Sequence, residues 1–273
     1  MIISASRRTD IPAFYSQWFI DCIQKGYCIV TNPFNPNQSK QVSLLPSDID
    51  AIVFWTRYPA PLMKYLDDLN TLGYRYIFLF TITGYPQWLE PHSQELSHTI
   101  NIFKSLSQAI GPQRIVWRYD PIVFSKDLNF DFHINNFNFI SNRLSGFTSK
   151  VIISIMEPYN KVLRRLKKIK EKEIVLYPLQ SFDNSTLQQF FSTLKTIALN
   201  NAMSIQSCCS NLINYEIDNG ACIDKTLLAD IFGIQLNYKK DPYQRKECLC
   251  AKSIDIGSYN TCKFDCLYCY ANK

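Results

Sequence analysis

Three cysteines near the end of the sequence have the type and spacing of a metal-binding loop. Cys262, Cys266 and Cys269 lie in the segment TCKFDCLYCYANK and form the pattern C-x3-C-x2-C. Three thiolates at this spacing can bind three corners of an iron-sulfur cube and leave one iron without a protein thiolate. An open metal position allows chemistry on a substrate, whereas a filled shell favours electron transfer. The spacing therefore predicts a 4Fe-4S cluster with one open iron, although a bare C-x3-C-x2-C pattern can also bind zinc.

A second set of cysteines precedes this loop. Its members are Cys208, Cys209, Cys222, Cys248 and Cys250. Four thiolates can close either a second iron-sulfur cluster or a zinc site, with Cys208 or Cys209 as one of the four. We expect Cys208, Cys222, Cys248 and Cys250 to form this second site, which could hold either an iron-sulfur cluster or a zinc ion. The alternative is that some of these thiols are reduced and serve as small buried apolar residues.

Composition sets the class of protein in which these cysteines work. The chain has 273 residues, of which 47% are hydrophobic and 19% are charged, so it can bury a substantial core. The opening residues MIISASRRTDIP lack the apolar region of a secretory signal, and no stretch approaches about 18 apolar residues. We expect a cytoplasmic protein without a membrane span. Its ten cysteines then indicate metal sites rather than disulfides, with Cys22 and Cys28 as core residues.

The cysteines must be positioned by a repeated strand and helix pattern. Six buried strands are predicted at 2–5, 51–56, 74–82, 114–119, 151–156 and 203–207, and helices are predicted near 14–25, 60–72, 93–110, 131–144, 159–171 and 185–200. Strand, helix, strand order implies parallel pairing, in a doubly wound sheet or a barrel. We favour an α/β fold with a partial (βα)6 barrel over 1–207, a hairpin insertion near 27–45, and a cysteine-rich tail over 208–273 packed on the barrel.

Polar residues follow several of the predicted strands. In parallel α/β folds, the loops at the carboxyl ends of strands converge on ligands. The candidate catalytic residues at these positions are Arg7, Arg8, Asp10, Arg118 and Asp120. An arginine-rich rim suits a carboxylate or a phosphate, so we expect a small-molecule substrate that is anionic. The alternative is that these residues form structural ion pairs at the rim.

The sequence lacks the residue patterns of several other kinds of functional site. His92, His98 and His133 lie in predicted helices or loops, where we expect surface or capping roles, and neither an H-E-x-x-H motif nor a phosphate-binding glycine loop occurs. The formal net charge is +6, and much of the excess lies in residues 164–173. We interpret that segment as a solvated helix face rather than a nucleic-acid site.

The cysteine loop and several other segments carry a family resemblance. The run CLYCY, with Tyr268 before the third cysteine, resembles the loop of radical S-adenosylmethionine enzymes. The segments ISASRRTDIPAFY, NPFNP, FTITGY, RIVWRYDP and the cysteine-rich ending resemble a bacterial domain-of-unknown-function family, DUF1848. Members of that family look like radical S-adenosylmethionine proteins whose cysteine loop lies after the last strand instead of the first. This resemblance extends over essentially the whole chain.

The resemblance implies a cofactor and a reaction class. In the radical superfamily the open iron chelates S-adenosylmethionine, and an electron from a donor such as flavodoxin or ferredoxin cleaves it to methionine and a 5'-deoxyadenosyl radical. The usual G-G-E after the second strand is absent, and FWTR occupies its place. Thr56, Arg57, Thr83 and Tyr268 are the expected contacts to the cofactor. Two alternatives stay open: a non-enzymatic iron-sulfur or zinc protein with an electron-transfer or structural tail, and a nucleic-acid repair or modification protein.

Overall fold

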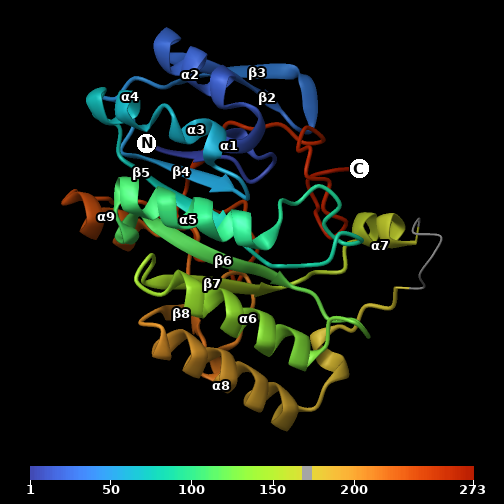
Figure 1. Ribbon diagram of the computed structural model, residues 1–273. Coiled ribbons are helices and arrows are strands. Elements are labelled where there is room, and N and C mark those ends of the chain that lie inside the picture. Colours follow the sequence, from blue (N-terminus) through green and yellow to red (C-terminus); the bar gives the residue numbers. More distant parts are fainter. Residues whose placement is uncertain (168–173) are drawn as a thin grey trace.

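An eight-stranded parallel sheet forms the centre of the computed structural model, which describes residues 1–167 and 174–273 (Figure 1). The strands are β1 (Ile2–Ala5), β4 (Ala51–Thr56), β5 (Tyr76–Thr81), β6 (Ile115–Ile122), β7 (Lys150–Ile155), β8 (Ser204–Ser207), β9 (Asp218–Asn219) and β10 (Ile254–Asp255). Their order across the sheet is β10-β1-β4-β5-β6-β7-β8-β9, and each ladder is parallel. From β4 to β8, each strand lies beside the next one in the chain, so the pairing predicted from sequence is confirmed.

The connections between the strands are mostly helical. The helices are α1 (Ile11–Phe14), α2 (Ser16–Lys25), α3 (Ala60–Met63), α4 (Leu66–Thr71), α5 (Leu96–Ile110), α6 (Phe130–Leu144), α7 (Asn160–Leu166), α8 (Asn184–Asn200) and α9 (Lys225–Phe232). Side-chain caps begin the long ones: Asn129 accepts from the amide of Phe132 before α6, and Asp183 accepts from the amide of Thr186 before α8. The strands β2 (Tyr27–Asn32) and β3 (Asn35–Ser43) form a separate antiparallel hairpin.

The two faces of the sheet are buried against different parts of the chain. Phe54, Phe78 and Trp117 point to the face covered by α2, α5, α6 and α8, which lie along one side of the sheet in Figure 1. Sequential crossovers of one hand place the helices on this same side. Val53 and Leu79 point to the other face, where they pack against side chains from residues 208–251. The cysteine-rich tail thus covers the face that the helices leave free.

The cysteine-rich tail contains two short strands, for which the sequence carries no signal. Strand β10 pairs with β1 through Ile3 and Ile254, and β9 pairs with β8 through Gln206 and Asp218. These strands contain two residues each, too few to show an alternating pattern in the sequence. The tail therefore extends both edges of the sheet, in addition to the strands that the sequence predicts.

Several other predictions need correction. The helix predicted at 14–25 begins at residue 16 as α2 and is preceded by the short α1, and the helix predicted at 60–72 is divided into α3 and α4. His133 is fully buried in the core instead of lying at the surface. Helix α7 ends at Leu166, and the rest of the predicted helix and charge segment, 168–173, lies outside the described residues.

The observed architecture confirms the predicted α/β class of the fold. The fold is mixed α/β with a parallel sheet, and a cysteine cluster lies near the end of the chain. The partial (βα)6 barrel and the division at residue 207 stay predictions. Among the described residues, no helix has the length and hydropathy needed to cross a membrane.

Candidate metal and substrate site

The cysteine loop and the strand ends line one cavity. Its volume is about 210 Å³. The lining includes Cys262, Cys266 and Cys269, the five candidate catalytic residues Arg7, Arg8, Asp10, Arg118 and Asp120, and the expected cofactor contacts Thr56, Arg57 and Tyr268. Thr83 instead lines a neighbouring cavity of about 280 Å³, which shares Arg57 with the first. The structure thus brings together residues from opposite ends of the sequence.

A buried arginine holds the backbone of the cysteine loop. The Arg165 guanidinium donates to the carbonyl oxygens of Cys266 at 2.8 Å and Asp265 at 3.0 Å, and to that of Cys269 at 3.4 Å. Its side chain is 6% exposed. Sequence analysis placed this arginine on a solvated face, because the composition of a basic run does not reveal that Arg165 turns inward. Arg165 therefore fixes the loop in the absence of regular secondary structure.

The tyrosine of the loop joins a second buried network. Arg57 donates to the hydroxyls of Tyr268 and Thr83, each at 2.8 Å, and forms an ion pair with Glu90. Tyr268 and Thr83 both donate to Glu90, at 2.5 Å and 2.6 Å. Burial opposes the charge of Arg57, but Glu90 and then Tyr268 raise its pKa well above the ordinary value. Arg57 consequently stays charged and binds the loop to the ends of β4 and β5.

Glu90 was missed by the sequence analysis. It is 1% exposed, and it lies in a connecting segment rather than directly after a strand. A single glutamate in the run WLEPH has no motif that distinguishes it from a surface residue. Its importance follows only from the fold, which places it beside the Arg57 side chain.

Two aspartates hold the segment that follows β1. Asp10 accepts from the amide of Ala13 at 2.9 Å and from that of Arg57 at 2.6 Å, and burial raises its pKa to about 7. Asp255 accepts from the hydroxyls of Ser4 and Ser6 and from the amide of Arg7, at 2.7 to 2.8 Å. Asp10 therefore connects two strand-end segments, which gives this candidate catalytic residue a clear positioning role.

The loop thiols have the surroundings of metal ligands. Burial raises the pKa of Cys262 to about 11, while the backbone amides of Phe264 and Asp10 oppose this shift. The amide of Ala271 donates to the sulfur of Cys269 at 3.3 Å. Amide hydrogen bonds to sulfur are a common means of stabilising the thiolates of iron-sulfur clusters. All three thiols line the cavity, and those of Cys262 and Cys269 receive amide hydrogen bonds of the kind that stabilise thiolate ligands.

Trp55 lies between two arginines at another wall of the cavity. The guanidinium carbons of Arg7 and Arg118 lie 5.2 and 4.7 Å from the centre of its ring. Arg118 forms an ion pair with Asp120, which also accepts from Ser154 at 2.6 Å. In the described parts of the chain, Arg7 Nη2, Arg118 Nε and Trp55 Nε1 are buried without a hydrogen-bond partner. This wall therefore carries unused donors.

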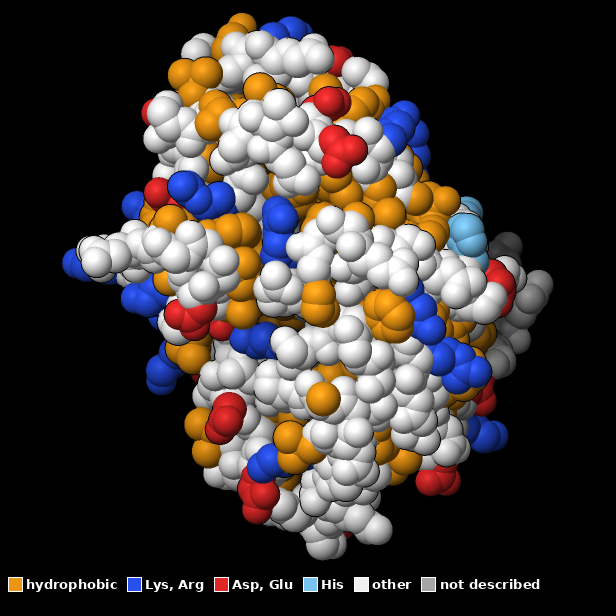
Figure 2. Space-filling view, turned by 60° about the vertical axis from the view of Figure 1, so that its left-hand side comes forward, with side chains coloured by type: hydrophobic (Ala, Val, Ile, Leu, Met, Phe, Trp, Pro, Cys, Tyr) orange, Lys and Arg blue, Asp and Glu red, His pale blue; other side chains and the backbone are white. Residues whose placement is uncertain are grey.

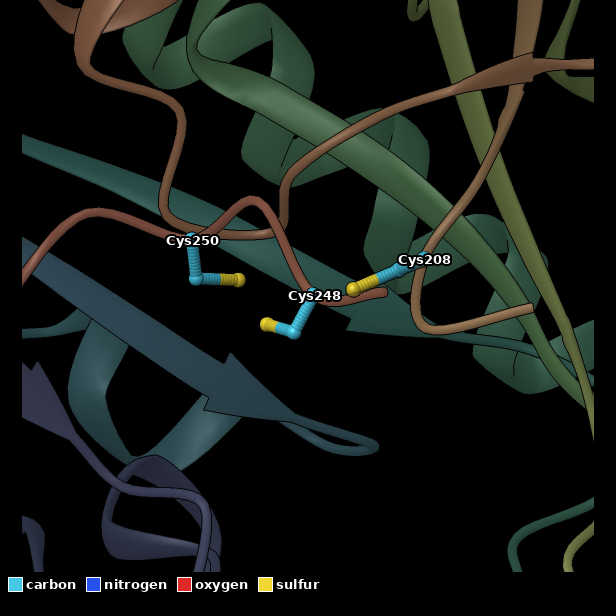
Figure 3. A group of neighbouring side chains, drawn as sticks. All are labelled: Cys208, Cys248 and Cys250. Atoms are coloured by element: carbon cyan, nitrogen blue, oxygen red, sulfur yellow. The ribbon is translucent and has the colours of Figure 1, made fainter. Parts of the chain in front are cut away.

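The other cysteine group is buried against the sheet. The sulfur atoms of Cys208, Cys248 and Cys250 point toward one another and lie within 4.8 Å of each other (Figure 3). Cys209 Sγ is 3.7 Å from Cys208 Sγ, and Cys222 is buried in the same group of packed side chains. Hydrogen bonds with neighbouring thiols, that of Cys209 foremost, raise the pKa of Cys208 well above its usual value. The same kind of contact lowers the pKa of Cys250, and the crowded sulfur atoms fit a metal that binds them as thiolates.

Sulfur spacing bears on which metal fits this group. Four thiolates on one zinc ion lie about 3.8 Å apart, given tetrahedral geometry and a zinc-sulfur distance of about 2.3 Å. In a cubane cluster the thiolates bind different irons and lie further apart. The sulfur atoms of Cys208, Cys248 and Cys250 lie within 4.8 Å of one another, so these three cysteines could hold a metal or a cluster.

Comparison with known proteins identifies the family. The family described as Domain of unknown function (DUF1848) matches residues 2–271, nearly the whole chain. The search of curated proteins gave no match. The chain therefore belongs to the DUF1848 family, as its motifs predicted.

Proposed function

We propose that this DUF1848 protein is a radical S-adenosylmethionine enzyme. In this proposal Cys262, Cys266 and Cys269 hold a 4Fe-4S cluster whose open position faces the cavity. The observation that supports it is the placement of all three thiols in the lining of the cavity that also contains the polar strand ends. The adjacent order of the strands β1 and β4 to β8 agrees with a partial barrel.

The chain would contribute position, charge and shielding from water. A bound cluster and S-adenosylmethionine would supply reductive cleavage to methionine and a 5'-deoxyadenosyl radical, with an electron from flavodoxin or ferredoxin. Arg165 and the network of Arg57, Glu90 and Tyr268 would hold the loop rigidly at the cavity. Thr56 is 3% exposed and accepts from the amide of Tyr58, so it shapes the cavity wall. Such enclosure protects a reactive intermediate from solvent.

The second cysteine group would have a different role. Cys208, Cys248 and Cys250 are buried, and they are not in the lining of the cavity among the described residues. With Cys222 as the fourth ligand they would form a closed centre, which suits structure or electron transfer. A non-enzymatic metal protein is the second candidate function, because this closed group is well formed independently of the cavity.

The nucleic-acid alternative has less support. On the face shown in Figure 2, Lys and Arg side chains are spread among uncharged residues and near Asp and Glu. A nucleic-acid surface ordinarily concentrates its positive charge on one face or along one helix. We therefore retain the enzyme as the leading proposal.

One experiment tests this proposal. The protein is reconstituted anaerobically with iron and sulfide, reduced with dithionite and mixed with S-adenosylmethionine. We expect 5'-deoxyadenosine in the product analysis and a changed EPR signal of the reduced cluster. A fully loaded, reduced protein that shows neither would exclude the enzyme and favour the non-enzymatic alternative.

A further inference from the structure

The arginines of the cavity differ in how well their charges are compensated. Of the residues that the structure describes, Arg7, Arg8, Arg57, Arg118 and Arg245 line the cavity. Arg57 is paired with Glu90 and Arg118 with Asp120. Arg245 has Glu157 at 3.1 Å and is 40% exposed, so water solvates it as well. The charge of each of these three guanidinium groups is therefore compensated, although Arg118 keeps one unused donor, Nε.

Arg7 has much weaker compensation. Its side chain is 13% exposed, and the shortest distance in its ion pair with Asp241 is 3.9 Å, which is too long for a hydrogen bond. Within the described chain, Arg7 Nη2 is buried and has no hydrogen-bond partner. A buried charge with unused donors is costly unless an opposite charge approaches it. The Arg7 guanidinium is therefore prepared for an anion.

Two further donors lie around the same indole ring. Arg118 and Arg7 both lie over Trp55, and the structure gives no acceptor for Arg118 Nε or Trp55 Nε1 among the residues it describes. The nearby carboxylate of Asp120 is already occupied by Arg118 and Ser154. A guanidinium group binds carboxylate and phosphate oxygens through parallel hydrogen bonds. The three residues together have the chemistry of an oxyanion subsite.

We propose that Arg7, with Arg118 and Trp55, binds a carboxylate or phosphate group of the substrate at this wall of the cavity. Calling the ligand a substrate rests on the proposed function, whereas anion binding itself does not. The proposal narrows the substrate to molecules with an oxyanion group that reaches the wall while the rest of the molecule extends into the cavity toward the cysteine loop.

Anion binding can be measured without turnover. Inorganic phosphate and, separately, acetate are titrated into the anaerobically reconstituted protein by isothermal titration calorimetry. We expect Arg7→Gln to weaken the preferred anion at least about tenfold, since hydrogen bonds to charged groups contribute on this scale. The matched control is Arg8→Gln, which removes the same charge from the same cavity. Arg8 donates to the carbonyl of Gly257 at 3.4 Å, and its guanidinium carbon lies 5.2 Å from the centre of the Tyr259 ring, so the control should change affinity less than about twofold.

A second variant and a comparison of the two anions complete the test of the subsite. Trp55→Phe keeps the ring but removes the indole N–H, and we expect a weakening of about threefold or more. This variant also tests the subsite if Arg7→Gln does not fold. Preference for phosphate or for acetate identifies the group of the substrate. Absence of binding by the wild-type protein, or equal weakening by Arg7→Gln and Arg8→Gln, would overturn the subsite.

The same preparations separate this inference from the proposed function. Arg7 also lies near the buried thiols of Cys250 and Cys222. If Arg7→Gln lowers the metal content of the second group and leaves anion affinity unchanged, Arg7 serves those cysteines and the subsite is wrong. Formation of 5'-deoxyadenosine without anion binding would reject the subsite but retain the enzyme. Anion binding without the nucleoside would retain the subsite and reject the radical reaction.

Discussion

The two cysteine groups use the same side chain in different surroundings. Cys262, Cys266 and Cys269 line a cavity at the strand ends, in a loop held by hydrogen bonds to its backbone. Cys208, Cys248 and Cys250 are buried among apolar residues on a face of the sheet. The first arrangement leaves space beside the thiols, and the second encloses them.

The difference follows from where each group meets the sheet. Strand ends carry polar residues and loops, so a metal placed there can meet a ligand. The face of a parallel sheet is apolar, so thiols placed there must be neutral or bound to a metal. The comparison teaches that cysteine spacing suggests a ligand set, while position on the sheet separates a reactive site from a closed one.

The strongest test of this comparison is the Cys266→Ala variant. We expect it to abolish formation of 5'-deoxyadenosine, because the cluster would lose one of only three protein thiolates. Metal analysis should show loss of the first cluster with the second site retained. The control Cys22→Ala removes a buried thiol from α2, outside both groups, and should keep activity and iron. Undiminished nucleoside formation by Cys266→Ala would contradict the assignment of the open site.

The reciprocal variant is Cys248→Ala. We expect loss of metal from the closed group and a fall of at least about 3 kcal/mol in the free energy of unfolding, because a structural metal contributes directly to folding. Urea denaturation and counts of iron, sulfide and zinc measure both effects. Cys28→Ala, which removes a similarly buried thiol from the hairpin, should keep all metal. Unchanged metal in Cys248→Ala would remove the second site, and loss of iron with sulfide would favour a cluster over zinc.

A smaller effect is expected from Arg165→Gln, which acts on the open group alone. The variant loses charged hydrogen bonds to the carbonyls of Cys266 and Cys269. We expect a cost of about 2 kcal/mol in unfolding free energy and a lower occupancy of the first cluster. Arg164→Gln is the matched control, since Arg164 is the exposed neighbour on the same helix. Equal iron content and stability in the two variants would show that Arg165 does not hold the loop.

Much of the sheet could be predicted from the sequence. Runs such as AIVFWT are apolar throughout, because a parallel strand is buried on both faces, and β4 has the predicted bounds. The helices that cover the sheet also have a clear periodicity, although propensity does not reveal where 60–72 divides between α3 and α4. The two-residue strands β9 and β10 have no local pattern, because they form by pairing with the edge strands β8 and β1.

The site was predictable where it carried a motif. The spacing of Cys262, Cys266 and Cys269 and the polar residues after the strands identified the lining of the cavity. Glu90 and Arg165 were not identified, because their role depends on long-range contacts: Glu90 meets Tyr268, and Arg165 meets the loop about 100 residues away. Sequence reasoning thus finds ligands more readily than the residues that position them.

The last prediction concerns the scaffold that both cysteine groups share. Burial lowers the pKa of His133 to about 4, and its ring contacts Tyr119 at 2.8 Å and the Val123 carbonyl at 3.0 Å. The stabilising effect of neutral His133 is complete above the unfolded pKa of about 6.5, and it is lost as the pH falls toward 4 because the unfolded state binds the proton first. Unfolding free energy should fall by about 1 kcal/mol between about pH 7 and pH 5.5.

Urea denaturation of the His133→Gln variant measures this effect. The variant should lack the pH-dependent fall in unfolding free energy, whatever its stability at pH 7. Because His133 lies in neither cysteine group, this fall should also persist in Cys248→Ala. If the pH dependence of the unfolding free energy disappeared in Cys248→Ala, it would instead arise from the cysteines.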